Sequence, residues 1–174
     1  MKTLVVYYSR SGRTRRAAER LAAALGADRE EIQDLENHQG LIGFFKAGHQ
    51  GMSGKSAQIG PVKADVGAYD LVVVGTPVWA GRMSSPVRAF LTQYGSRIRH
   101  VAYLLTRADR RNEYLGICTE MDELIGKTHL AAKSLCSSSR TFLEEVDAFA
   151  AGLGPGSPPA GDPSDRDGPV FQNL

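Results

Sequence analysis

The sequence predicts an α/β fold in which a parallel sheet is covered by helices on both faces. Continuous apolar runs at residues 4–8 and 71–74 are typical of strands that are buried on both faces. Each run leads to a segment with helical apolar spacing, and strands that alternate with helices indicate parallel crossovers. The chain has 174 residues, of which 42% are hydrophobic, and this is enough for one packed domain.

The individual elements follow from local patterns along the chain. We expect strands at residues 4–8, 31–35, 71–74, 101–106 and 130–135. The first helix ends at Gly26, and the second begins at the capping sequence Ser84-Ser85-Pro86 and closes at Gly95. A third helix is expected over residues 113–125, and a last one carries its apolar stripe from Phe142 to Leu153.

Two segments depart from this alternation. Residues 37–55 form a long, glycine-punctuated connection in which Phe44 and Phe45 favour a short helix or flap packed on the body. Residues 154–174 are rich in Gly, Pro, Ser and Asp and cannot bury a core, so we expect a tail with little regular structure. The predicted domain therefore covers residues 1–153.

Composition argues against several classes of function. The formal net charge is only +2 and the basic residues are scattered, so no nucleic-acid partner is expected. No apolar stretch approaches the ~18 residues of a membrane span, and residues 1–3 leave no room for a secretory leader, so a cytoplasmic protein is expected. Cys118 and Cys136 are far apart and are expected to be free thiols, and no cluster with metal-ligand spacing predicts a metal site.

The turn after the first strand is a candidate anion site with the sequence Ser9-Arg10-Ser11-Gly12-Arg13-Thr14. It offers hydroxyl groups, a glycine that allows close backbone approach, and the unpaired N–H groups of the helix that follows. It is neither a GxGxxG nor a Walker A motif. Four cations lie around this predicted helix start: Arg10, Arg13, Arg15 and Arg16. Cations are disfavoured at the positive end of the helix dipole. Either these arginines are merely solvated, or an anion lies among them.

The turn after the third strand, Gly75-Thr76-Pro77-Val78-Trp79-Ala80-Gly81, indicates a planar ligand. Trp79 is the only tryptophan of the chain, and an exposed indole here can stack on a flat aromatic ring; the alternative is that it covers the end of the sheet. Ligands of open parallel sheets bind beyond the carboxyl ends of the strands, where both turns lie. The two turns together predict a ligand with a phosphate at one end and a flat ring at the other, as in FMN.

These two motifs resemble those of the flavodoxin-like family, and the resemblance extends over residues 1–153. It implies a flavodoxin-like three-layer sandwich with a five-stranded parallel sheet of order 2-1-3-4-5, and noncovalently bound FMN. The candidate cofactor-binding residues are Ser9, Arg10, Ser11, Gly12, Arg13 and Thr14 around the phosphate, Thr76, Pro77, Val78, Trp79, Ala80 and Gly81 around the ring, and Thr106 and Arg107 in a third turn.

The third turn departs from the family pattern, which often has a glycine there. Its sequence from residue 106 is TRADRRNEY, with Asp109 and three arginines, Arg107, Arg110 and Arg111. Positive charge beside the flavin would stabilise the anionic reduced form. The alternative is that these arginines simply point to solvent.

The resemblance implies a redox function. Electron-shuttle flavodoxins are typically acidic, whereas this chain has an isoelectric point near 8.6. This favours an FMN-dependent oxidoreductase that passes electrons from NAD(P)H to a small acceptor such as a quinone, with a homodimer possible. The alternatives are a non-enzymatic electron-transfer flavodoxin that serves a redox partner protein, and a binding module without redox turnover. Catalytic side chains are not predicted, because the cofactor carries the chemistry.

Overall fold

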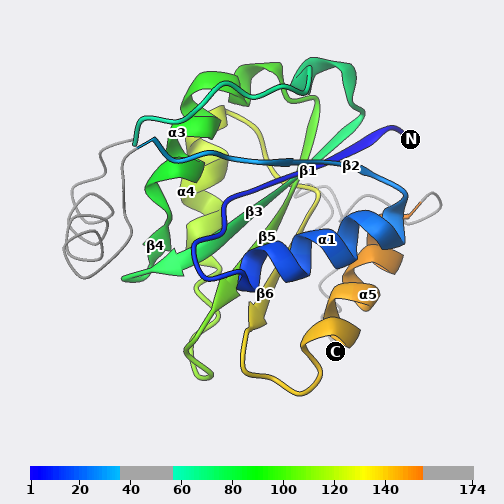
Figure 1. Ribbon diagram of the computed structural model, residues 1–174, viewed down its shortest axis with the longest axis vertical. Coiled ribbons are helices and arrows are strands. Elements are labelled where there is room, and N and C mark those ends of the chain that lie inside the picture. Colours follow the sequence, from blue (N-terminus) through cyan, green and yellow to red (C-terminus); the bar gives the residue numbers. More distant parts are fainter. Residues whose placement is uncertain (36–56, 155–174) are drawn as a thin grey trace, which may run out of the picture.

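A parallel sheet with the strand order β2-β1-β3-β5-β6 forms the centre of the computed structural model (Figure 1). The structure describes residues 1–35 and 57–154, so the predicted connection over 37–55 and the predicted tail beyond residue 154 lie outside the described residues. The strands are β1 (Thr3–Tyr7), β2 (Asp28–Glu31), β3 (Leu71–Trp79), β5 (His100–Arg107) and β6 (Ala131–Cys136), and the short β4 (Arg82–Met83) pairs antiparallel with the end of β3. The predicted order of the parallel strands is confirmed, with the β3–β4 hairpin as an addition.

Helices cover both faces of the sheet and complete the three layers. The helices α1 (Arg13–Leu25) and α5 (Phe142–Leu153) lie on one face, and α3 (Ser85–Tyr94) and α4 (Gly116–Ile125) lie on the other (Figure 1). Two short 3-10 turns, Val66–Ala68 and Gly95–Arg97, precede β3 and β5.

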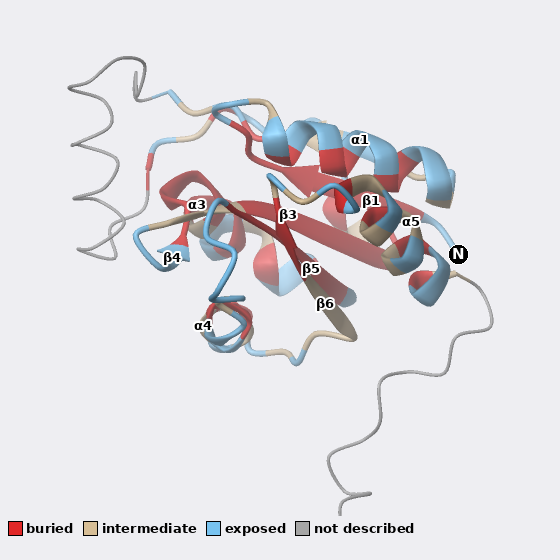
Figure 2. Cartoon of the chain, turned by 90° about the horizontal axis from the view of Figure 1, so that it is seen from below, coloured by how far each residue is buried: buried red, intermediate tan, exposed pale blue. Residues whose placement is uncertain are grey.

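Alternation of side chains along each strand explains this arrangement. In β1, Leu4 and Val6 belong to the core on the α3/α4 face, whereas Val5 and Tyr7 belong to the core on the α1/α5 face. All four side chains are fully or almost fully buried, and the sheet is enclosed between the helix layers (Figure 2). The continuous apolar runs in the sequence therefore correspond to strands that are covered on both sides.

The second strand is shifted from its predicted place at residues 31–35. It covers Asp28–Glu31 and pairs in parallel with β1, from Leu4 opposite Asp28 to Tyr7 opposite Glu31. β2 lies at the edge of the sheet and its first two residues are exposed, so polar residues can form it without an apolar pattern. The apolar Ile32, which favoured the later position, is buried just beyond the strand.

The start of α3 also differs in detail from the sequence-based expectation. Ser84 is the N-cap residue and a proline lies in the first turn, as predicted, but the Ser84 side chain makes no capping hydrogen bond. Its hydroxyl instead lies 3.1 Å from the hydroxyl of Thr76, and the Ser84 N–H donates to that same Thr76 oxygen at 3.1 Å. The serine thus connects the start of α3 to Thr76 within β3. The following helix, α4, begins three residues later than predicted, at Gly116.

Candidate functional site

A cavity of about 250 Å³ lies at the carboxyl edge of the sheet, where four connecting segments meet. It brings together most of the residues predicted from the two motifs and from the third turn. Its lining consists of Ser11, Arg13, Thr14, Pro77, Val78, Trp79, Thr106, Arg107, Ala108 and Ser137.

The β1–α1 turn has the features of an anion site. Gly12 is the N-cap residue of α1 with φ 82°, a left-handed conformation that glycine adopts without strain, and no side chain caps the first turn. The Ser9 hydroxyl oxygen is buried and has no hydrogen-bond partner among the described residues. A buried hydroxyl without a partner is unusual in a folded protein, and this one belongs to the turn that leads into the uncapped start of α1. Both observations fit a bound oxyanion such as a phosphate group.

The planar part of the site is built on a β-hairpin rather than on an irregular loop. β3 continues to Trp79, which pairs with Arg82 across a two-residue turn. Both turn residues have positive φ, 47° at Ala80 and 75° at Gly81, as two-residue hairpins of the favoured hand require. This turn holds the indole at the rim of the cavity.

Trp79 both lines the cavity and covers the end of the sheet, so the two interpretations of this residue are not exclusive. The indole is half-buried and meets the ring of Tyr8 edge-on, with ring centroids 5.5 Å apart. Burial, with a further contribution from the negative charge of Asp34, raises the pKa of Tyr8 to about 12, so its phenol is neutral beneath the indole. The guanidinium carbon of Arg10 lies 5.9 Å from the Trp79 ring centroid, which places Arg10 at the indole and not in the lining of the cavity.

A hydrogen bond between two buried hydroxyls connects the anion turn with the third turn. The side-chain oxygens of Thr14 and Thr106 lie 2.8 Å apart. This contact joins the first turn of α1 to the end of β5, so it connects two walls of the cavity.

Two of the three arginines in the third turn are held by hydrogen bonds and do not simply point to solvent. Arg107 is only 8% exposed, and its Nε donates to the Ser134 hydroxyl at 3.0 Å while another of its nitrogens donates to the backbone oxygen of Asp109. Arg110 donates to the hydroxyl and the backbone oxygen of Ser138, at 3.3 and 3.4 Å. Of the three arginines, Arg111 alone is exposed without a side-chain hydrogen bond among the described residues. The predicted positive charge is therefore built into this edge of the sheet.

Several predicted residues do not line the cavity: Ser9, Arg10, Gly12, Thr76, Ala80 and Gly81. Gly12, Ala80 and Gly81 shape the two turns through their backbones. Thr76 is fully buried, and its hydroxyl is occupied by Ser84 and by the backbone oxygen of Pro77 at 3.0 Å. Because β3 runs on for three residues beyond it, Thr76 lies inside the sheet and not at its edge.

Sequence reasoning missed Ser137, Ala108 and Tyr114. Ser137 follows β6, whose carboxyl end lies at the same edge as the others, so the rule that identified three turns also identifies this fourth one. Tyr114 has φ 55°, rare for a residue with a side chain, and an added Cβ at Gly81 would lie 3.6 Å from its ring. Its hydroxyl donates to Asp109 at 3.2 Å. Nothing in the local sequence marks this contact.

A family model for NADPH-dependent FMN reductases matches residues 1–107, which contain the anion turn, the Trp79 hairpin and the end of β5. The chain belongs to this family. The predicted flavodoxin-like relationship and the predicted cofactor, FMN, are thereby confirmed. No curated protein matches the chain.

Solved structures of flavoproteins resemble this member of the FMN reductase family in fold. A flavoprotein from Lactobacillus acidophilus NCFM in complex with FMN is 25% identical, with a TM-score of 0.63 over 75% of this chain and 91% of that one. A putative flavoprotein from Bacteroides uniformis is 21% identical, with a TM-score of 0.73 over 86% of this chain and 97% of that one. A WrbA-like flavodoxin from Agrobacterium tumefaciens is 19% identical, with a TM-score of 0.56 over 86% and 92%. The last two show the fold. None of the helices in the described ranges is long and apolar enough to cross a membrane.

Proposed function

We propose that this protein is an FMN-dependent oxidoreductase that takes electrons from NAD(P)H and passes them to a small acceptor such as a quinone. The observation that carries the proposal is the cavity in which the uncapped first turn of α1 and the Trp79 hairpin face one space. A phosphate site and an aromatic platform are what a flavin nucleotide requires, and the family assignment points to the same cofactor.

The chain's own residues divide the binding of FMN between them. The uncapped N–H groups of α1, the hydroxyls of Ser9 and Ser11 and the guanidinium of Arg13 suit the phosphate. Trp79 suits one face of the flavin ring, and backbone groups of Pro77 and Val78, which line the same cavity, suit its rim. FMN supplies the hydride and electron chemistry when it is bound, so the protein needs to orient it and to admit a second molecule. The flavin-binding domain of our proposal covers residues 1–153.

Basic character at this edge favours an enzyme over an electron carrier. Arginines occupy two of the turns that meet here, with Arg13 in the β1–α1 turn and both Arg107 and Arg110 in the β5–α4 turn. A carrier that docks on basic partners by long-range attraction would need the opposite sign. The positive charge of this edge attracts a small anionic electron donor or acceptor.

Visible spectroscopy with added FMN tests the cofactor, and anaerobic mixing tests the function. We expect flavin absorption bands that remain with the protein after gel filtration, and direct bleaching of these bands by NADPH or NADH. Absence of tight FMN binding would overturn the proposal. Bleaching that needs a separate reductase would instead support the electron-transfer flavodoxin.

The remaining expectations have less structural support. Both cysteines are free and buried, which suits a reducing compartment such as the cytoplasm. A homodimer and the lack of a nucleic-acid partner stay predictions, as does the role of residues 37–55.

A further inference from the structure

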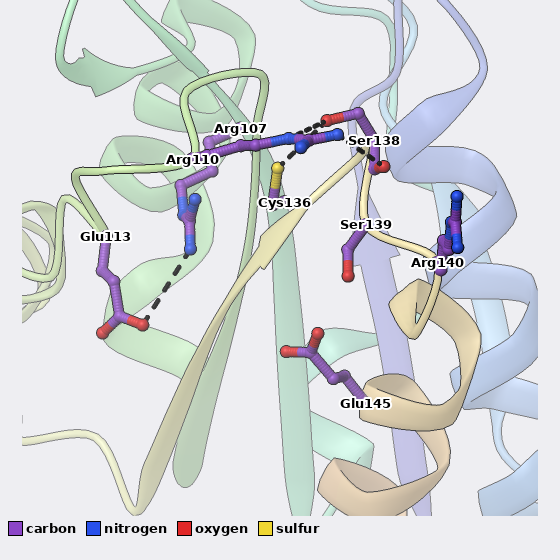
Figure 3. Close-up of a pocket in the computed structure, with 8 residues that line it drawn as sticks. All are labelled: Arg107, Arg110, Glu113, Cys136, Ser138, Ser139, Arg140 and Glu145. Carbon is purple, nitrogen blue, oxygen red and sulfur yellow. Dashed lines mark hydrogen bonds and ion pairs between the residues drawn. The ribbon is translucent and has the colours of Figure 1, made fainter.

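A second cavity, of about 600 Å³, lies beside the flavin cavity at the same edge of the sheet. It is formed between the β5–α4 turn and the β6–α5 turn, and Arg107 lines both cavities. Figure 3 shows Arg110 reaching from the first of these turns toward Ser138 on the second, with Cys136 between them. The lining consists of Arg107, Arg110, Glu113, Cys136, Ser138, Ser139, Arg140 and Glu145.

The two carboxylates in this lining already have partners. Glu145 lies 3.1 Å from the Lys133 ammonium and accepts a hydrogen bond from the Thr141 hydroxyl at 2.9 Å. Glu113 is exposed and lies 3.9 Å from the guanidinium of Arg107, a long ion pair for a buried cation. The carboxylates therefore do not neutralise the other two arginines of the cavity.

Arg110 and Arg140 form no ion pair with any residue in the described ranges 1–35 and 57–154. Six of the arginines outside this cavity pair with a carboxylate, whereas Arg13, Arg16 and Arg82 have no such pair within the described ranges. The pairs are Arg15–Glu31, Arg20–Asp147, Arg29–Glu19, Arg88–Glu120, Arg97–Asp65 and Arg99–Asp70. Guanidinium groups that lack a carboxylate and line a cavity with serine hydroxyls are suited to an incoming carboxylate or phosphate.

Cys136, in the wall of the cavity, is also affected by the positive charge of these arginines. A hydrogen bond from the Ser138 hydroxyl, with further contributions from the charges of Arg107 and Arg110, outweighs burial and lowers the pKa of Cys136. The other cysteine, Cys118, lies in the α3/α4 core, where burial raises its pKa to about 11. Groups that favour a thiolate at this place favour any other anion there.

We propose that this second cavity binds the anionic group, a carboxylate or a phosphate, of the small molecule that exchanges electrons with the flavin. Arg110 and Arg140 supply the charge, and the N–H groups of their guanidiniums supply the hydrogen bonds to the anion. A volume of about 600 Å³ is typical of a small-molecule site. Because Arg107 forms part of both walls, a molecule anchored here by its anionic end can extend toward the flavin cavity. The electron exchange rests on the function proposed above, whereas the binding of the anion does not.

Titration of the FMN-loaded protein with inorganic phosphate, followed by amide NMR spectra, tests the binding. FMN occupies the anion turn with its own phosphate, so further binding reports on the second cavity. We expect shifts of amides in residues 107–111 and 137–140, and an affinity lowered about tenfold in the variant Arg110→Gln/Arg140→Gln. Arg99→Gln is the matched control, because Arg99 is exposed at the opposite edge and pairs only loosely with Asp70, at 3.8 Å.

Competition kinetics then distinguish the source of the anionic group. If phosphate raises the KM for NADPH but not for NADH, the phosphate of the electron donor occupies the cavity. If it raises the KM only for a carboxylate-bearing quinone, the acceptor occupies it. Either result supports the proposal.

Three outcomes would overturn the proposal. The first is a titration without shifts in these two turns, and the second is an equal loss of affinity in the Arg99→Gln control. The third is a response to polyglutamate but not to phosphate, which would identify a docking surface for an acidic protein. If the chain does not bind FMN, the same titration of FMN-free protein still reports on residues 107–111 and 137–140, so failure of the cofactor assignment is distinguishable from failure of the anion site.

Discussion

The carboxyl edge of the sheet has two halves that are suited to anions in different ways. In the hairpin half, formed by the β1–α1 turn and the Trp79 hairpin, most of the donors are backbone N–H groups and hydroxyls, with Arg13 as the one guanidinium in the lining. In the arginine half, formed by the β5–α4 and β6–α5 turns, the donors are long guanidinium side chains. Backbone donors are held by the fold and lose no side-chain entropy on binding, whereas an arginine must be ordered each time. The first arrangement suits a resident cofactor and the second an exchanging substrate.

The largest effect that separates the two halves is expected from Trp79→Ala. Loss of an aromatic platform weakens stacking by roughly 10–100-fold in affinity. Fluorescence titration with FMN measures this loss, and Trp79→Phe should recover part of it. Arg110→Gln should leave the FMN affinity unchanged. If the alanine variant binds FMN as tightly as the natural protein, the indole is not part of the flavin site.

A matched pair of glycines tests the backbone donors of the hairpin half. Gly12 and Gly26 begin and end the same helix with φ 82° and 60°, and an added Cβ meets nothing within 4 Å at either position. Gly12→Ala and Gly26→Ala should therefore each lower the free energy of unfolding by about 1–2 kcal/mol. Only Gly12→Ala should also lower the FMN affinity, by about tenfold, because it displaces the first N–H groups of α1. Chemical denaturation and FMN titration of both variants measure the two effects, and equal FMN affinities would remove the α1 terminus from the site.

Loss of the hydrogen bond between Thr14 and Thr106, at the boundary between the halves, should have a moderate effect on stability. Thr106→Val leaves the buried hydroxyl of Thr14 without its partner at 2.8 Å, and we expect a loss of about 1 kcal/mol and a Tm lower by about 2–4 °C in FMN-free protein. The double variant Thr14→Val/Thr106→Val should be more stable than the single variant, because no hydroxyl is then left unpaired. Thermal unfolding of the natural protein and the two variants measures both effects. A double variant that is less stable than Thr106→Val would contradict a direct hydrogen bond.

The smallest expected effect is a shift in the titration of Cys136. Its pKa is lowered by the Ser138 hydroxyl and by the arginine half, so the thiolate should form below the pH at which an ordinary cysteine ionises. Arg110→Gln removes a positive charge that stabilises the thiolate, so the midpoint should move to higher pH by a fraction of a unit. Ultraviolet absorbance of the thiolate in a Cys118→Ala background measures it. A midpoint that does not change would show that Arg110 exerts no field in this cavity.

The apolar pattern of the sequence was sufficient to predict the layers, whereas the strand order came from the resemblance to the flavodoxin-like family. Strands covered on both faces have runs of apolar residues, so β1, β3 and β5 could be recognised locally. The edge strand β2 could not, because its sequence DREE has no apolar pattern and its place depends on pairing with β1. The hairpin was missed because Ala80 takes a conformation that turn statistics assign to Gly, Asn or Asp.

The candidate site was predicted in part. Hydroxyls and glycine in the β1–α1 turn and the lone tryptophan were local signals, and the cavity brings Ser11, Thr14 and Trp79 together. Thr76 was predicted as a binding residue but does not line the cavity, because its hydroxyl is hydrogen-bonded to Ser84. Only the tertiary structure shows that β3 continues beyond Thr76. The second cavity depends on the contact of the Arg110 side chain with Ser138 on the β6–α5 turn. No local sequence pattern predicts a contact between residues so far apart in the chain.

The turn at Ala80 also bears on how the protein can be engineered. An alanine in the left-handed region is strained by about 1–2 kcal/mol, and asparagine or glycine would occupy the same turn with less strain. Ala80 lies next to Trp79, which lines the cavity at the sheet edge, yet the Ala80 side chain is exposed and does not line that cavity. The hairpin therefore offers designers one position where thermal stability can be raised beside the cavity without altering the groups that line it.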